Sequence, residues 1–200
     1  MQAFAQPVFD AQRIFRTVLE VLSRPAQPRR FPVFPESLPE FFSPVLAGVA
    51  LSLCDGETPV WLSPCLRRDV VQAWLRFHCG CPVVESPEKA AFALACCPSD
   101  LPPLSAFAQG VPAYPDRSAT VCLAGLAFGQ GKPFRASGPG IRGGTAFACT
   151  LPDGFAAQWR ANNASFPLGV DMLLCSADSI AGLPRTTRLD VPAQENEPCM

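Results

Sequence analysis

Residues 90–96 (AAFALAC), 118–124 (SATVCLA) and 170–176 (VDMLLCS) are three short and nearly continuous apolar runs. Such runs are typical of strands buried on both faces of a parallel sheet, whereas a strand with one solvated face alternates apolar and polar residues. Helical patterns lie between and around these runs. This alternation predicts an α/β fold, in which residues 1–191 form a single three-layer domain with a mixed sheet flanked by helices.

Apolar spacing, capping residues and turn signals predict the other elements. The clearest helix is expected over residues 10–23, with Asp10 as its N-cap. Its apolar stripe consists of Ile14, Phe15, Val18, Leu19 and Leu22. Further helices are expected at 43–56, 67–78, 104–108 and 153–162, the last one capped by Asp153. Further strands are expected at 59–62, 134–137, 146–150 and 187–191.

The segment 25–42 is dense in proline and contains four phenylalanines. It has too many aromatic residues for a flexible linker, so we expect it to wrap the domain surface in extended form. Its aromatic side chains, from Phe31 to Phe42, are also our candidates for covering the surface of a partner. Residues 192–200 are polar and predict a flexible tail.

Composition favours a globular protein with an extra apolar interface. The 200 residues are 48% hydrophobic and 16% charged, whereas soluble domains are roughly 25% charged. We therefore expect a homodimer that buries surface beyond its own core. The net charge of −1 creates no global field for nucleic acid. The longest apolar stretch, near 45–51, is far shorter than the roughly 18 residues of a membrane-spanning helix.

The ten cysteines could suggest a disulfide framework. However, residues 1–8 lack the charged and apolar regions of a secretory signal. Several cysteines also lie inside apolar runs, where a free cysteine acts as a small core residue. The sequence therefore predicts a cytoplasmic protein with free thiols.

Gly138 and Gly140 begin a G-x-G-x-x-G spacing that ends at Gly143. In a dinucleotide site this turn opens a helix whose N-terminus holds the pyrophosphate, and an acidic residue follows about twenty positions on. Here Pro139 interrupts the motif and no helix is predicted before residue 153. We expect instead a tight turn that brings backbone amides close to a ligand or another chain.

His78 is the only histidine, and Cys79 and Cys81 follow it closely. Three potential metal ligands therefore lie within four positions. Structural zinc sites usually use paired ligands, and the chain has no C-x-x-C. We expect His78 and Gly80 to end a helix and no metal to bind there.

Asp171 lies inside an apolar strand, where a carboxylate needs a partner. Arg185 begins the approach to the next strand and can supply that partner as a structural ion pair. The alternative is a phosphate or carboxylate site built from Arg185 and the hydroxyls of Thr186 and Thr187.

Together these segments resemble a known family, the H subunit of the bacterial carbon–phosphorus lyase system, which degrades phosphonates. The order and spacing agree from about residue 8 to residue 190. The segments that carry the resemblance are 15–16 (FR), 23–25 (SRP), 55–62 (DGETPVWL), 75–78 (LRFH), 138–141 (GPGI), 166–171 (FPLGVD) and 184–187 (PRTT). One departure is Ala26, where the family usually has glycine.

The resemblance implies a fold similar to the large domain of pyridoxal-phosphate-dependent transferases, without the cofactor. It implies an accessory, non-catalytic subunit that works with the G, I and J subunits and forms a homodimer when isolated. That complex joins an alkylphosphonate to the ribose of ATP and releases adenine, giving ribose 1-methylphosphonate 5-triphosphate; the glycosidic chemistry belongs to the I subunit. Candidate ligand or subunit contacts are Arg24, His78, Gly138, Gly140, Asp171, Arg185, Thr186 and Thr187.

Two other functions remain open from the residues alone. A stand-alone nucleotide- or phosphate-ester-binding enzyme would bring Arg24, His78 and Arg185 together in one deep pocket. A thiol or zinc module would need four ligands around a common point.

Overall fold

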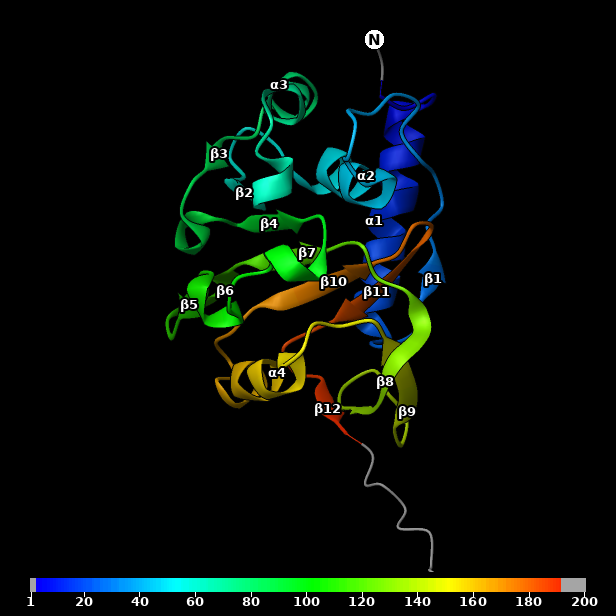
Figure 1. Ribbon diagram of the computed structural model, residues 1–200, viewed down its shortest axis with the longest axis vertical. Helices are drawn as coiled ribbons and strands as arrows, with labels where there is room; N and C mark the ends of the chain where they lie inside the picture. Colours follow the sequence, from blue (N-terminus) through cyan, green and yellow to red (C-terminus); the bar gives the residue numbers. More distant parts are fainter. Residues whose placement is uncertain (1–2, 192–200) are drawn as a thin grey trace, which may run out of the picture.

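The computed structural model describes residues 3–191, and a seven-stranded mixed sheet forms its centre (Figure 1). The strand order is β1-β11-β10-β7-β4-β2-β3. Five neighbouring strands are parallel: β3 (Val83–Val84), β2 (Val60–Leu62), β4 (Phe92–Ala95), β7 (Thr120–Leu123) and β10 (Asp171–Cys175). The antiparallel strands β11 (Ser179–Leu183) and β1 (Arg29–Arg30) complete one edge.

Alternate strand residues face two separate cores, because side chains along a strand point to opposite faces. Leu94 and Cys122 belong to one core, whereas Ala93 and Val121 belong to the other. The first core packs under α1 (Pro7–Ser23), α2 (Pro44–Leu53) and α3 (Asp69–His78). The second packs under α4 (Phe155–Ala164) and a small sheet of β12 (Arg188–Asp190), β8 (Phe128–Ser137) and β9 (Thr145–Cys149). The predicted mixed α/β architecture, with helices on both faces of a sheet, is confirmed.

Short elements connect these layers. A hairpin of β5 (Gln109–Val111) and β6 (Tyr114–Ser118) stands apart from both sheets. The helix expected at 104–108 is a single 3₁₀ turn. The 3₁₀ turns are η1 (Pro64–Leu66), η2 (Pro87–Lys89), η3 (Pro98–Asp100) and η4 (Leu104–Ala106).

Two predicted helix caps are wrong. The first helix begins at Pro7 with Gln6 as its N-cap, and the Asp10 carboxylate accepts a hydrogen bond of 2.9 Å from the Gln6 backbone N–H. Asp10 therefore stabilises the first turn from inside the helix. The N-cap of α4 is Gly154 with φ of 77°, a left-handed conformation that favours glycine, while Asp153 precedes it.

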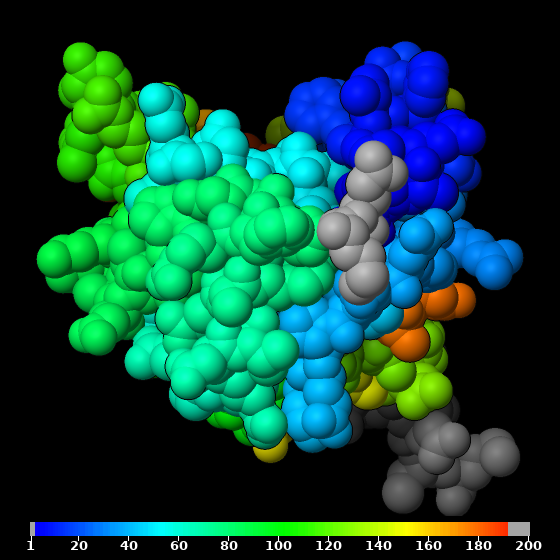
Figure 2. All heavy atoms as spheres, turned by 90° about the horizontal axis from the view of Figure 1, so that it is seen from above, coloured from blue at the N-terminus to red at the C-terminus, as the bar shows by residue number. Residues whose placement is uncertain are grey.

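The apolar stripe of α1 is wider than the surface that it buries. Ile14 and Val18 pack into the core, whereas 45% of Phe15 and 51% of Leu19 is exposed. Val8 is 79% exposed and shares their helical face, since it lies seven residues before Phe15. Figure 2 shows the blue spheres of α1 at the margin of the molecule. The exposed fractions of these three side chains show that the other described residues leave this apolar face largely uncovered.

The segment 25–42 contains one short strand, β1, and is otherwise irregular. Phe31 and Phe42 are buried in the protein's own core, so their expected role in covering a partner is wrong. Phe34 and Phe41 remain exposed. Ala26 has φ of 58°, in the left-handed region that favours glycine, which is the residue that the family resemblance leads one to expect there.

The expectation of free thiols is wrong for one pair, because Cys65 and Cys96 are joined by a disulfide. The other cysteines of the described residues are free: Cys54, Cys79, Cys81, Cys97, Cys122, Cys149 and Cys175. The predicted tail, 192–200, lies outside the described residues. None of the described helices combines the length and apolar character that crossing a bilayer requires.

Candidate functional site

Arg185 and Asp171 lie at the amino-terminal edge of the central parallel strands. Asp171 is the first residue of β10 and is paired with Thr120, the first residue of β7. The Arg185 guanidinium donates to both Asp171 carboxylate oxygens, from Nη2 at 2.6 Å and from Nε at 3.1 Å. Its backbone N–H donates to the same carboxylate at 2.8 Å. The structural ion pair considered from the sequence is therefore present.

The remaining guanidinium donors of Arg185 bind other segments. Nη1 donates to the carbonyl oxygens of Pro115 at 3.0 Å and Pro167 at 3.2 Å, and Nη2 also donates to the Ser118 hydroxyl. A guanidinium has five N–H donors, and these contacts use all of them. Only 12% of the side chain is exposed. Arg185 thus joins β6, β10 and the loop before β10 rather than presenting a free fork to an external anion.

The glycine motif packs against the same region. A Cβ atom on Gly138 would lie 2.9 Å from the carbonyl oxygen of Thr186, and a Cβ on Gly140 would lie 2.2 Å from that of Ser23. Both glycines have positive φ. The next element is strand β9, not a helix, so the turn lacks the helix N-terminus that holds a pyrophosphate in a dinucleotide site. The expected close approach of backbone segments is within this chain.

Helix α4 holds the segment around Thr187 in place. Trp159 Nε1 donates to the Thr187 carbonyl oxygen at 2.8 Å, and Asn163 Nδ2 donates to the Arg185 carbonyl oxygen at 2.7 Å. The buried Asn162 amide makes hydrogen bonds with both the N–H and the C=O of Val170. Sequence reasoning missed these residues. Two adjacent asparagines on a helix that must pack against a sheet were the available signal, since buried amides need partners.

Five of the candidate residues thus share one network. Gly140, in the same turn as Gly138, packs against the Ser23 carbonyl oxygen at the end of α1. Asp171 and Arg185 form the ion pair of the network, and Gly138 packs against Thr186. Thr187 is completely buried, and its hydroxyl oxygen has no hydrogen-bond partner among the described residues. The carbonyl groups of this segment, rather than its hydroxyls, make the contacts with α4.

His78 is outside this network. It is the last residue of α3, and its ring packs 4.6 Å from that of Trp74 and 4.9 Å from that of Phe77, measured between centroids. Burial lowers the pKa of the imidazole. Figure 1 places α3 and α4 at opposite ends of the molecule.

Arg24 is the C-cap of α1 and forms an ion pair of 3.8 Å with Glu20. Its side chain is 60% exposed. The stand-alone enzyme considered above needs Arg24, His78 and Arg185 in one pocket. Five pockets of residues 3–191 have linings that contain none of these three residues.

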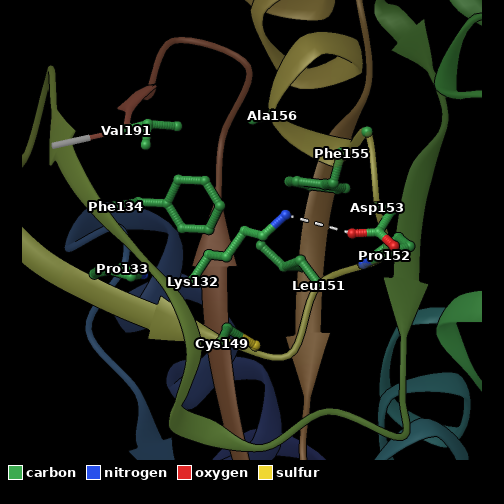
Figure 3. Close-up of a pocket in the computed structure, with 11 residues that line it drawn as sticks. Lys132, Pro133, Phe134, Cys149, Leu151, Pro152, Asp153, Phe155, Ala156 and Val191 are labelled. Atoms are coloured by element: carbon green, nitrogen blue, oxygen red, sulfur yellow. Dashed lines mark hydrogen bonds and ion pairs between the residues drawn. The ribbon is translucent and has the colours of Figure 1, made fainter. Parts of the chain in front are cut away.

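The largest of these pockets, about 640 Å³, lies between β8, β9 and the start of α4 (Figure 3). Its walls are mostly apolar and include Phe134, Cys149 and Phe155. Burial raises the pKa of the Cys149 thiol to about 12. At the rim, Lys132 Nζ lies 3.4 Å from an Asp153 carboxylate oxygen. This pocket could not be predicted from the sequence, because its lining comes from three separate segments.

The potential metal ligands of the 77–81 segment do not form a cluster with other ligands among residues 3–191. Among residues 3–191, one group of three metal-ligating side chains lies within mutual reach, and it consists of Cys65, Cys96 and Asp100. His78 is not part of it. Cys79 and Cys81 are not part of it either.

Comparison with known proteins agrees with the resemblance seen in the sequence. Residues 2–190 match the family described as "Bacterial phosphonate metabolism protein (PhnH)". The chain is 39% identical over 189 residues to "Alpha-D-ribose 1-methylphosphonate 5-triphosphate synthase subunit PhnH" of Rhizobium meliloti (strain 1021), covering 94% of each chain. It is also 38% identical over 78 residues to "Putative C-P lyase subunit protein HtxG" of Stutzerimonas stutzeri, covering 38% of this chain and 40% of that protein. The chain therefore belongs to the PhnH family of bacterial phosphonate metabolism proteins.

Proposed function

We propose that this chain is an accessory, non-catalytic subunit of the complex that joins an alkylphosphonate to the ribose of ATP with release of adenine. The observation that carries the proposal is the similarity to a synthase subunit over 94% of both chains. A match of that extent covers the central sheet, the helices on both faces and the Arg185 network together.

The contacts of the candidate residues support a structural role. The Arg185 guanidinium donates hydrogen bonds to Asp171, Ser118 and two carbonyl oxygens of the same chain. Gly138 and Gly140 allow backbone segments to touch. These residues hold separate segments of the chain in register, as a subunit that presents a defined surface to others requires.

We also propose a fold relationship, partners and a location for this chain. The fold is similar to the large domain of pyridoxal-phosphate-dependent transferases but takes no such cofactor, and residues 1–191 form one domain. The partners are the G, I and J subunits, and the isolated chain is a homodimer in the cytoplasm. The exposed face of α1, formed by Val8, Phe15 and Leu19, is a suitable contact surface because it is apolar and uncovered.

Reconstitution tests the proposal. Purified G, I and J subunits would be combined with ATP and methylphosphonate, with and without this chain, and adenine release measured by chromatography. We expect this chain alone to release no adenine and its addition to increase the yield of the complex. His78→Ala should assemble normally and leave adenine release largely intact, because His78 lies outside the Arg185 network.

Two results would contradict the proposal. One is adenine release by this chain alone. The other is loss of adenine release in a His78→Ala complex that still assembles, which would favour the stand-alone enzyme reading of Arg24, His78 and Arg185. A melting curve of the variant ensures that a folding defect is not mistaken for lost chemistry.

A further inference from the structure

Two cysteines and one aspartate meet at the carboxyl edge of the parallel strands. Cys65 lies in the turn after β2, and Cys96 directly follows β4, the parallel neighbour of β2. Asp100 ends the 3₁₀ turn after Cys96. Open α/β sheets bind ligands outside the carboxyl ends of their strands, so these residues occupy an edge suited to a site.

The three ligand atoms are close together. The two sulfur atoms and an Asp100 carboxylate oxygen all lie within 4.8 Å of one another. The Cys96 sulfur is 3.6 Å from Asp100 Oδ2. All three side chains are half-buried, so solvent reaches them while the surrounding loops restrict their positions.

The buried Ser63 orients both cysteine loops. Its hydroxyl lies 3.2 Å from the Cys65 sulfur and accepts a hydrogen bond of 3.2 Å from the backbone N–H of Cys96. Ser63 is completely buried. Its contacts hold the two loops together independently of the bond between the sulfurs, which is the role of an outer shell around a metal site.

The spacing fits a tetrahedral zinc ion. Zn–S bonds of about 2.3 Å and Zn–O bonds of about 2.0 Å place a sulfur and an oxygen ligand about 3.5 Å apart, and the Cys96–Asp100 separation is 3.6 Å. The Cα atoms of Cys65 and Cys96 are 6.8 Å apart, at the wide end of the range for bridged cysteines. Two sulfur ligands of a tetrahedral zinc ion lie roughly 3.8 Å apart. The Cys65 and Cys96 sulfurs can reach that separation without bringing the two loops closer together.

We propose that Cys65, Cys96 and Asp100 bind a thiophilic divalent cation such as zinc once the Cys65–Cys96 disulfide is reduced. Thiolates and carboxylates are zinc ligands, and the cation balances two of the three negative charges that they bring together. A cytoplasmic location keeps most cysteine pairs reduced. The disulfide and the metal site are then the oxidised and reduced states of one cysteine pair.

One of the three ligands also borders a pocket. Cys96 lines a cavity of about 440 Å³ together with Phe41, Ala124 and Gly125. Three protein ligands and one open position are typical of zinc sites that bind water or a small ligand. The site thus differs from the Arg185 network at the opposite edge of the same strands, and it goes beyond the proposed subunit function.

Cobalt binding tests this site. A water-soluble phosphine first reduces the disulfide: the phosphine takes the oxygen of one water molecule and becomes a phosphine oxide, and each sulfur gains a proton. Co²⁺ is then added to the gel-filtered protein and displaces the two thiol protons. We expect one Co²⁺ per chain, with the near-ultraviolet absorption of thiolate-to-cobalt charge transfer, and displacement by Zn²⁺.

Variants identify the ligands. Cys96→Ser should remove the charge-transfer band, and Asp100→Asn should weaken Co²⁺ binding about tenfold or more. Cys79→Ser is the matched control, since Cys79 is also half-buried but lies outside the ligand group, and it should bind Co²⁺ as the parent does. Asp100→Asn also covers the case in which Cys96→Ser fails to fold, which a melting curve would reveal.

The proposal is overturned if the reduced parent shows no charge-transfer band, or if the oxidised parent binds Co²⁺ equally well. A band of full size in folded Cys96→Ser, unchanged affinity in Asp100→Asn, or loss of the band in Cys79→Ser would also overturn it.

Discussion

The Arg185 guanidinium and the Asp171 carboxylate form a two-point ion pair, with N–O distances of 2.6 and 3.1 Å, at one end of the β10–β11 ladder. The ladder pairs Met172 with Leu183, so Asp171 and Arg185 lie just beyond its last pair. The ion pair closes the end of the ladder, and the other guanidinium donors extend it to Pro115, Pro167 and Ser118. One side chain thereby connects β6, the loop before β10 and the segment after β11.

We expect Arg185→Ala to lower the free energy of unfolding by about 3–5 kcal/mol, because it leaves a mostly buried carboxylate without its cation. The Asp171 side chain is 28% exposed, so solvent offsets part of the loss and the lower value is the better estimate. Urea denaturation followed by circular dichroism measures the change.

Two variants show whether the contacts, rather than charge alone, matter. Arg185→Lys keeps the charge but not the five-donor fork, so we expect it to recover only a part of the stability. Arg188 is exposed, and Arg188→Ala should change the free energy of unfolding by less than about 0.5 kcal/mol. Equal losses in Arg185→Ala and Arg188→Ala would rule out a special role for the Asp171 pair.

Gly140→Ala should destabilise the protein through a backbone clash. Its new Cβ would lie 2.2 Å from the Ser23 carbonyl oxygen at the end of α1, and its φ of 79° also disfavours alanine. Gly143 has a similar φ of 71°, but a Cβ there would meet nothing within 4 Å. We expect Gly143→Ala to cost about 1 kcal/mol and Gly140→Ala clearly more. Equal melting temperatures for the two variants would show that the contact with α1 is unimportant.

The sequence predicted the central parallel strands well and missed a buried neighbour of β10 in the same sheet. The runs at 90–96, 118–124 and 170–176 became β4, β7 and β10 because each lies between two other strands and is covered on both faces. Strand β11 was missed. It contains Gly182, on which a Cβ would lie 2.4 Å from the Val21 carbonyl oxygen of α1. Glycine is required there by the contact between the strand and the helix, and the pattern of apolar residues along the sequence does not reveal that contact.

The ion pair of the candidate site could be predicted from the sequence, but the other hydrogen-bond partners of Arg185 could not. A carboxylate at residue 171 beside an apolar strand requires a cation, and the structure contains the pair with Arg185. The carbonyl partners of Arg185 come from residues 115 and 167, which are distant in sequence. The bridging of Cys65 and Cys96 was missed for the same reason, because 31 positions separate them and only the parallel pairing of β2 and β4 brings them together.

His78 should make stability depend on pH. Burial lowers the imidazole pKa in the folded chain. The unfolded chain, in which the imidazole pKa is about 6.5, therefore binds more protons than the folded chain does. The contribution of His78 is then fully present above that unfolded pKa and is lost as the pH falls through the folded one. We expect the parent to lose more stability between pH 7.5 and pH 5 than His78→Gln does, in urea melts at both pH values. Identical losses would show that His78 does not contribute.

We expect the protein to bind no pyridoxal phosphate. The chain has two lysines that could form a Schiff base, and Lys132 is paired with Asp153 at the rim of the β8–α4 pocket, with its side chain 80% exposed. A Schiff-base lysine needs a desolvated site and a phosphate cradle. Incubation with the cofactor followed by gel filtration should leave no lysine–pyridoxal absorbance. A retained band that disappears in Lys89→Ala or Lys132→Ala would contradict this expectation.

We expect the exposed face of α1 to form the dimer interface. Val8, Phe15 and Leu19 lie on one side of the helix, where Phe15 is 45% and Leu19 51% exposed. An aspartate at either position remains hydrated in the monomer, so the variants should fold. A charge placed within an apolar interface should cost about 2 kcal/mol or more, which raises the dissociation constant about thirtyfold.

We therefore expect the isolated protein to be a dimer in light scattering and Phe15→Asp/Leu19→Asp to be a folded monomer with an unchanged circular dichroism spectrum. Loss of the dimer by itself lowers the melting temperature. The control is Val111→Asp, since Val111 is 50% exposed but lies on the β5–β6 hairpin. A dimer that persists in the α1 double variant would place the interface elsewhere. If the parent is a monomer, the apolar face of α1 is available to the other subunits instead. The same double variant should then fail to assemble with them, because the opposite face of α1 is already packed in the core.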